Sequence, residues 1–568
     1  MIRSRLLASA LGLSLGLALM SGAVQAAEAQ PNPAPGATAA ATQAPERASP
    51  ALIVTVVVDQ LSANLFNQYR SQFTGGLKTL ADQGLVSING YQTHGVTVTC
   101  AGHSTILTGA HPARSGIPAN DWIDTRTGQT TYCLAAPENA LAHGKNTDNG
   151  PVGPGLMTAS TLGDWLKAVS PDSRVYGVSG KDRGAITLAG HKGDGAFWLT
   201  EGFGFTTYVE PGQSAEARLA PMAALNARMI DRFSRTPPSW TYANDGCRRL
   251  AGQWTIAGQT FESKLPPADF SLDNSPILDE LTIEGAIALM DSQQLGRRGV
   301  VDMLGVSLSA TDRIGHGYGT QGPEMCEQML RLDAALGVLL DKLTTIPGGA
   351  VVVLTSDHGG SDFPERSAVE GYPDAGRVDR ALQPRVNAAL KARFGLDADP
   401  LVSSGGGFVI VDKDRKSLPE PLRAQVLAAA LDLLNAEPQV ALAVSRDELL
   451  AEPLPNGNPE NLSLREGLRL SAVAGRSPDI LRAWQPGLTG QGRVGGAISS
   501  HGSAWDYDRR VPIVFWWPGA QGQERFLPMR TIDIAPTLAN LIGVKPDGEI
   551  DGRCMDLPQF AKGRCEAK

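Results

Sequence analysis

The sequence lacks any long apolar run beyond its first 26 residues, which argues against a chain that spans a membrane several times. The one such run, residues 6–20, follows two arginines and precedes a small-residue segment that ends at Ala26. A short apolar segment with these flanks is typical of a secretory signal peptide. We therefore expect residues 1–26 to be a signal peptide, and a periplasmic or secreted protein without a membrane span.

The chain also has no excess of basic residues. It carries 50 Lys and Arg against 58 Asp and Glu, a formal net charge of −8. A nucleic-acid-binding surface normally shows a basic stripe, so we expect no nucleic-acid partner. A locally basic pocket can still bind phosphate, and the partners we expect are small-molecule phosphate monoesters.

Cysteine is scarce, with six residues, and no two of them form a Cys-x-x-Cys pair. This spacing argues against a zinc site built from cysteine. An even number of cysteines in an exported chain is compatible with up to three disulfides. We expect Cys554 to pair with Cys565, because the two lie close together in a Gly- and charge-rich tail.

Two common hydrolase and nucleotide motifs are missing as well. Gly102-His-Ser104 lacks the second glycine of a nucleophile elbow. Lys181 is followed by Asp182 rather than Ser or Thr, and it lacks the upstream glycine of a P-loop. The spacing therefore favours neither motif.

What the sequence does contain is an alternation of β-branched runs and amphipathic helical patterns. It begins after residues 27–50, an Ala- and Pro-rich stretch that we expect to be a linker. The runs occupy residues 52–58, 175–178, 300–307, 351–354 and 511–516, with helical patterns such as 158–169 and 324–343 between them. This alternation predicts a three-layer α/β/α sandwich with a mainly parallel central sheet, formed by residues 51–568. Pro- and Gly-punctuated stretches around 198–276 and 363–497 are expected to be insertions that cap the site.

Polar side chains stand next to these predicted strands. Ligands bind outside the carboxyl ends of the strands in open sheets of this kind, so we expect the polar residues to form the site. They are Asp59, Lys181, Arg183, Asp312, His316, Asp357 and His358, together with His501, which precedes the last strand.

Six of these residues have the chemistry of metal ligands, because neutral imidazole and carboxylate form a good donor set for zinc. They divide into two groups of three, Asp312/His316/His501 and Asp59/Asp357/His358. Each group leaves a position open, as catalytic zinc requires. The sequence therefore predicts two zinc ions per chain, with manganese or cobalt as alternatives. Of the other histidines, only His103 is expected to support this site, by contacting a ligand.

Residues 96–109 form a hydroxyl-rich segment between two turn-rich stretches. Its candidate nucleophiles are Thr97, Thr99, Ser104 and Thr105. A threonine is a poor nucleophile until a base or a metal activates it, so the predicted metal ligands make this segment a candidate nucleophile loop.

In chain order, Asp59, Thr99, Asp312-x-x-x-His316, Asp357-His358 and His501 resemble the signature of the alkaline phosphatase superfamily. The resemblance extends from about residue 51 to residue 553. It implies one zinc on each group of three ligands. It also implies that Thr99 is both the nucleophile and a ligand of the second zinc, held by Asp59, Asp357 and His358.

Two further segments resemble the phosphate-irrepressible, broad-specificity bacterial alkaline phosphatases. Lys181-Asp-Arg183 resembles their Lys-x-Arg element, and the segment from Gly116 to Trp122 resembles their Gly-Ile-x-x-Asn-x-Trp element. The resemblance implies that Lys181, Arg183 and Asn120 hold the phosphate oxygens. The backbone N–H of Cys100 would be a further donor to the phosphoryl group.

The resemblance thus implies hydrolysis of phosphate monoesters through a phosphothreonine at Thr99. A monoester dianion carries one more charge than a diester, and Lys181 with Arg183 would match that charge. Two alternatives stay open. One is a nucleotide pyrophosphatase/phosphodiesterase that uses the same metals, although Thr99-Cys-Ala-Gly-His103 differs from the Thr-Phe-Pro-Asn-His typical of diesterases. The other is a non-catalytic zinc-dependent binding module.

Overall fold

The computed structural model describes residues 47–144, 149–200 and 204–565. The expected signal peptide, 1–26, and most of the expected linker, 27–50, lie outside the described residues. The last residues of the expected linker contact the C-terminal part of the chain, because the backbone N–H of Arg47 donates to the carbonyl of Gln559 at 2.9 Å. Residues 47–50, the end of the stretch that we expected to be a linker, therefore belong to the folded part of the chain. Within the described part of the chain, no helix has the length and apolar character needed to cross a membrane.

The central sheet is built on strand β1, Leu52–Val58, whose seven residues are all buried. Five strands in this part of the sheet run parallel, in the order β14-β1-β13-β7-β8. Their bounds are Ala350–Thr355, Leu52–Val58, Asp302–Leu308, Val175–Ser179 and Gly195–Thr200. Continuous β-branched runs suit strands that are covered on both faces, and four of these five strands coincide with such a predicted run.

Shorter strands extend the sheet at both edges. On one side, β21 (Ile513–Trp516) pairs antiparallel with β14, followed by β2 (Leu85–Ser87) and β22 (Gln523–Arg525). On the other side, β9 (Gly204–Thr206) pairs antiparallel with β8. The first insertion, expected around 198–276, therefore begins later than Trp198, because β8 and β9 still belong to the central sheet.

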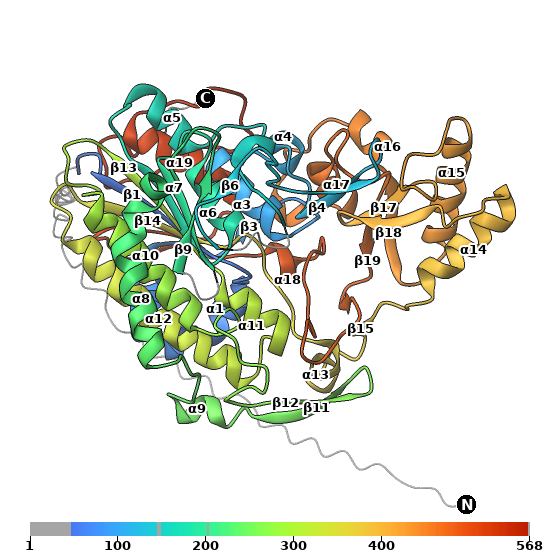
Figure 1. Ribbon diagram of the computed structural model, residues 1–568, viewed down its shortest axis with the longest axis horizontal. Helices are drawn as coiled ribbons and strands as arrows, with labels where there is room; N and C mark the ends of the chain where they lie inside the picture. Colours follow the sequence, from blue (N-terminus) through green and yellow to red (C-terminus); the bar gives the residue numbers. More distant parts are fainter. Residues whose placement is uncertain (1–46, 145–148, 201–203, 566–568) are drawn as a thin grey trace, which may run out of the picture. The chain divides into compact units, whose positions relative to one another are not determined.

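Two sets of helices cover the two faces of this sheet (Figure 1). One set contains α10 and α12, and the other contains α3, α5, α6 and α19. Their bounds are Ile277–Ser292 and Pro323–Thr344 for the first set, and Thr99–Thr108, Leu162–Val169, Asp182–Ala189 and Ile534–Ile542 for the second. The three-layer α/β/α architecture with a mainly parallel sheet is thus confirmed.

A second, smaller sheet lies within the stretch 363–497. Its four strands are antiparallel in the order β16-β17-β19-β18, with bounds Leu401–Ser404, Gly407–Ile410, Ile480–Trp484 and Val440–Ser445. Helices α14 (Leu382–Phe394) and α15 (Leu422–Asn435) share a separate hydrophobic cluster with it. The inserted stretch therefore has a core of its own.

Three disulfides join the six cysteines. The pairs are Cys100–Cys133, Cys247–Cys326 and Cys554–Cys565. The expected pairing of Cys554 with Cys565 is confirmed. The other two pairs join residues 33 and 79 positions apart, so only the fold brings them together.

Candidate active site

The predicted site residues meet at one edge of the central sheet. Asp59 follows β1 directly, and Asp357 and His358 follow β14. After β13 the chain enters helix α11, Ala310–Tyr318, which carries Asp312 and His316 one turn apart. Because β1, β13 and β14 are parallel neighbours, their carboxyl ends lie side by side.

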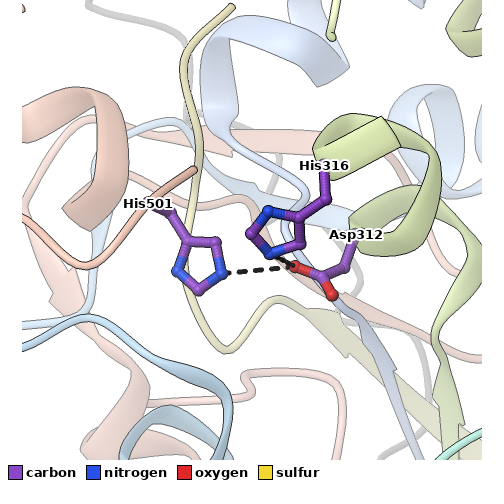
Figure 2. A group of neighbouring side chains, drawn as sticks. All are labelled: Asp312, His316 and His501. Atoms are coloured by element: carbon purple, nitrogen blue, oxygen red, sulfur yellow. Dashed lines mark ion pairs between the residues drawn. The ribbon is translucent and has the colours of Figure 1, made fainter. Parts of the chain in front are cut away.

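The first group of candidate ligands joins helix α11 to a distant loop (Figure 2). The Nε2 atoms of His316 and His501 both lie 3.3 Å from Oδ1 of Asp312. Their ligand atoms all lie within 4.8 Å of one another, close enough for a single cation. His501, 185 residues beyond His316 in the chain, completes a group that helix α11 begins.

The second group is Asp59, Asp357 and His358. The Nε2 of His358 lies 3.4 Å from Oδ1 of Asp59 and 3.4 Å from Oδ2 of Asp357. All three side chains are completely buried. Their ligand atoms also lie within 4.8 Å of one another. His103 supports this group as expected, since its Nδ1 lies 2.9 Å from Oδ2 of Asp357.

The two groups are direct neighbours. The imidazole rings of His358 and His501 stack with centroids 3.6 Å apart. Lys181 lies between the groups, with Nζ 2.5 Å from Oδ2 of Asp59 and 2.6 Å from Oδ2 of Asp312. The structure therefore brings Lys181 together with one carboxylate from each group.

The donor atoms suit divalent cations. Each histidine bonds a backbone carbonyl through Nδ1: His316 with Ser499, His358 with Gly359 and His501 with Thr97. A Nδ1–H bond to a carbonyl directs the Nε2 lone pair toward the centre, which is the usual orientation of a histidine ligand. Three atoms at the centre are buried without a hydrogen-bond partner among the described residues: Asp59 Oδ1, Asp312 Oδ1 and His358 Nε2. Buried carboxylates in this position call for a cation.

Burial and the closeness of the carboxylates shift the pKa values of several side chains at the site. Burial, and then the nearby Asp312 and Asp357, raise the pKa of Asp59 above its ordinary value. Burial also lowers the pKa of His358, so this imidazole is neutral at pH 7 and able to bind a metal. For His501, burial acts against protonation, yet the contact with Asp312 raises the pKa to about 9. A cation bound there would displace that proton.

Thr99 is the first residue of helix α3 and is almost completely buried. The other three candidate hydroxyls donate to backbone carbonyls, Thr97 to Ser503, Ser104 to Ala101 and Thr105 to Gly102. Within the described ranges, the Thr99 hydroxyl has no hydrogen-bond partner. Its position at the helix N-terminus places backbone N–H groups and the positive end of the helix dipole nearby, which favours an anion.

Asn120 lies against the start of helix α3. Its Oδ1 accepts a hydrogen bond from the backbone N–H of Cys100 at 2.8 Å, and its backbone carbonyl accepts one from Cys133 at 2.9 Å. The Cys100 N–H, expected to bind a phosphoryl oxygen, therefore bonds Asn120 instead. This contact leaves the side-chain NH₂ of Asn120 as a donor.

Arg183 lies in the first turn of helix α6, two residues beyond Lys181. Its Nε is buried and finds no hydrogen-bond partner in the described part of the chain. Burial would lower its pKa, but Tyr132 and Asp182 more than offset this and raise it, so the guanidinium is charged. Tyr132 in turn donates to Asp182 at 2.8 Å. Sequence reasoning did not identify Tyr132, which has no motif around it.

A cavity of about 370 Å³ adjoins the site. Its lining includes Asn120 and His501 and, from the inserted sheet, Arg482 and Trp484. Nothing in the sequence near Arg482 or Trp484 marked them as site residues, because they reach the cavity only through the folding of the inserted stretch.

Comparison with known proteins adds a family. A family model described as type I phosphodiesterase / nucleotide pyrophosphatase matches residues 53–488. The chain is 39% identical over 519 residues to alkaline phosphatase PhoK of a Sphingomonas species, covering 89% of this chain and 91% of that protein. It is 36% identical over 526 residues to alkaline phosphatase PhoD of Zymomonas mobilis, covering 91% and 90%. The crystal structure of wild-type alkaline phosphatase PafA aligns with a TM-score of 0.77 at 26% identity, covering 90% of this chain and 99% of that one.

Proposed function

The chain belongs to the type I phosphodiesterase/nucleotide pyrophosphatase family of the alkaline phosphatase superfamily, and we propose that it is a zinc-dependent alkaline phosphatase acting through a phosphothreonine at Thr99. Phosphoester hydrolysis follows from membership of the family. The preference for monoesters rests on one observation, the position of Lys181 between Asp59 and Asp312 with Arg183 two residues away. Its relatives PhoK and PhoD, both named alkaline phosphatases, support the same choice.

Two metal ions fit the residues present. Asp312, His316 and His501 would hold one, and Asp59, Asp357 and His358 would hold the other. Thr99 is the proposed further ligand of the second. When bound, such ions stabilise negative charge at the attacking and leaving oxygens. Zinc is the metal that a mixed imidazole and carboxylate set favours, and manganese and cobalt are alternatives.

The reaction consists of two in-line displacements. In the first, Oγ1 of Thr99 attacks phosphorus; a bond from Oγ1 to phosphorus forms as the ester bond to the leaving oxygen breaks. The threonine hydroxyl gives up one proton and the leaving alcohol takes one up. In the second, water attacks the phosphothreonine, releases inorganic phosphate and restores the hydroxyl. Two inversions give retention at phosphorus.

Three side chains hold the transferred group in this scheme. Lys181 and Arg183 neutralise the two charges of the monoester, and Asn120 donates through its NH₂. Because positioning and charge stabilisation provide most of the catalysis in phosphoryl transfer, these donors set the rate more than any proton transfer does. A diester offers one charge fewer, so it gains less from the same donors.

Nucleotide pyrophosphatase/phosphodiesterase activity is the second candidate, favoured by the description of the matching family model. The two are separated by measuring kcat/KM of the purified protein for p-nitrophenyl phosphate and for bis-p-nitrophenyl phosphate. We expect the monoester to be strongly preferred, and the Thr99→Ala variant to be inactive on both. A preference for the diester would refute the monoesterase assignment. Mass spectrometry of the acid-quenched enzyme should find one phosphoryl group on the peptide that contains Thr99.

We also propose that the protein works outside the cytoplasm. Three disulfides are typical of an oxidising compartment, and they accord with the expected signal peptide. Cell fractionation with an antibody against the chain tests this. Recovery of the protein with the cytoplasmic fraction, at its full uncleaved mass, would contradict it.

A further inference from the structure

The cavity beside the site extends from the candidate reaction centre to the inserted sheet. On the site side its lining includes Asn120 and His501. On the far side it is lined by Gly405 and Gly406, between β16 and β17, and by Arg482 and Trp484 of β19. Its volume of about 370 Å³ is in the range that holds a small organic ligand. A phosphate ester bound at Thr99 has a leaving group that must occupy space of this kind.

Arg482 is the feature that gives this cavity a chemical preference. Its guanidinium carbon lies 3.9 Å from the ring centroid of Trp484 and 5.7 Å from that of Phe408. A guanidinium stacked on an aromatic face keeps its N–H donors in the plane of the group, so stacking does not consume them. Stacking therefore fixes the orientation of Arg482 and leaves its donors available.

No carboxylate in the described ranges pairs with Arg482, and its buried Nε has no hydrogen-bond partner there. Burial, with no acid to oppose it, lowers the pKa of the Arg482 guanidinium to about 10, so the group is charged at pH 7. Two other arginines of the inserted stretch differ: Arg423 and Arg446 lie 2.9 and 3.4 Å from Oδ1 of Asp479. Keeping a half-buried cation without a negative partner costs free energy, and a bound anionic ligand would remove that cost.

Two acidic residues also line the cavity, and neither forms an ion pair with Arg482 among the described residues. Asp508 is buried and accepts a hydrogen bond from the backbone N–H of Ser503 at 2.8 Å. Asp121 follows Asn120 directly and begins strand β4, Asp121–Asp124, and among the described residues it forms no ion pair with Arg482. Arg482 borders a second cavity of about 230 Å³ as well, which leaves room for an anionic group around its donors.

We propose that Arg482, held by Trp484, forms a leaving-group subsite for a second anionic group. The enzyme then prefers phosphate monoesters whose leaving group itself carries a carboxylate or a phosphate. This inference rests on the proposed function, since it assigns the substrate class of the same site. Arg482 would bind the second anion through a two-pronged, charge-assisted contact.

Matched substrates test the subsite. The neutral substrate is 4-carbamoylphenyl phosphate, and its anionic counterparts are 4-carboxyphenyl phosphate and 4-(phosphonomethyl)phenyl phosphate. The readout is the ratio of kcat/KM for each anionic substrate to that for the neutral one. We expect this ratio to fall about tenfold or more in Arg482→Met, as the loss of a charged hydrogen bond predicts, and to fall less in Arg482→Lys. The two anionic substrates show whether carboxylate or phosphate is the preferred group.

Arg393→Met is the matched control, because Arg393 also stacks on an aromatic ring, 5.3 Å from the centroid of Phe394, but lies exposed on α14 and lines none of these cavities. Its ratio should equal that of the parent enzyme. Circular dichroism of each variant checks folding.

Three results would overturn the subsite: a parent ratio near one, an unchanged ratio in Arg482→Met, or an equal fall in Arg393→Met. If the parent hydrolyses none of these monoesters, the proposed function fails instead. Calorimetric binding of 4-carboxybenzylphosphonate and 4-carbamoylbenzylphosphonate then decides the subsite separately: equal affinities refute it, and a preference for the carboxylate that is lost in Arg482→Met supports it.

Discussion

The side-chain oxygen of Asn120 accepts a hydrogen bond from the backbone N–H of Cys100, 2.8 Å away and one residue beyond Thr99. Cys100 is also joined by a disulfide to Cys133, whose own N–H donates to the Asn120 carbonyl. A covalent link and two hydrogen bonds therefore tie Asn120 to the start of helix α3. The arrangement fixes where the Asn120 NH₂ lies relative to Thr99.

Replacing Cys100 and Cys133 together by serine should lower kcat/KM for p-nitrophenyl phosphate about tenfold, because the Asn120 donor loses its fixed position. Removing a link between residues 33 positions apart should also cost about 3–4 kcal/mol of stability, measured by denaturant unfolding. Cys554→Ser with Cys565→Ser is the control that should leave kcat/KM intact. In the protein without this disulfide, Asn120→Ala should lower kcat/KM less than it does in the parent. An equal loss in both proteins would show that the Cys100–Cys133 disulfide does not position Asn120.

Replacing Lys181 and Arg183 together by alanine should lower kcat/KM at least about a hundredfold for p-nitrophenyl phosphate, and less than about tenfold for bis-p-nitrophenyl phosphate. The reason is the extra charge of the monoester, which Lys181 and Arg183 are proposed to match. Arg70→Ala with Lys78→Ala, two partly exposed cations in surface ion pairs, should change neither rate. Equal losses on both substrates would contradict the assigned role.

Chelation of the metal should abolish activity and lower the melting temperature, because three carboxylates then lie buried beside one another with Lys181 as the neighbouring cation. Adding zinc back should raise the melting temperature with concentration, by mass action. Asp59→Asn should weaken this response, whereas His191→Ala, which removes a histidine paired with Asp164 outside both groups, should not. A melting temperature that is indifferent to zinc in the chelated protein would refute the two metal sites.

Asp279 links helix α10 to helix α11. Its carboxylate accepts hydrogen bonds from the Ala310 N–H at 2.9 Å and from Gln328 at 2.7 Å, while burial raises its pKa to about 7. A carboxyl whose folded pKa exceeds its unfolded value binds its proton more tightly when folded. Stability is therefore lost as pH rises from about 4 to about 7, and no further above that.

Asp279→Asn removes this ionisation and keeps an oxygen for Ala310. Its melting temperature relative to the parent should therefore rise between pH 5 and about pH 7 and then level off, which thermal unfolding from pH 5 to pH 8 measures. Asp82 is exposed and paired with Lys78, so Asp82→Asn is the control. The difference in melting temperature between Asp82→Asn and the parent should not increase between pH 5 and pH 7. A pH-independent difference for Asp279→Asn would mean that the carboxyl is already ionised at pH 5.

Much of the site could be predicted from local patterns. The β-branched runs around Asp59 and Asp357 marked buried parallel strands, and parallel strands end at a common edge, so the residues that follow them had to meet. The four-residue spacing of Asp312 and His316 needed only one turn of helix α11. The beginning of the first insertion was misplaced at Trp198, because β8 carries no continuous β-branched run beyond that point and β9 is only three residues long.

The sequence by itself determined the main parallel strands, the neighbouring pairs Asp312/His316 and Asp357/His358, and the hydroxyl-rich segment around Thr99, because each is encoded by short-range spacing. Only the tertiary structure decided that Cys100 pairs with Cys133, that Lys181 lies between Asp59 and Asp312, and that Arg482 lines the cavity beside the site. These relationships join residues 33 to more than 100 positions apart. They depend on how the sheets, helices and inserted strands pack, and no local pattern along the chain records that packing.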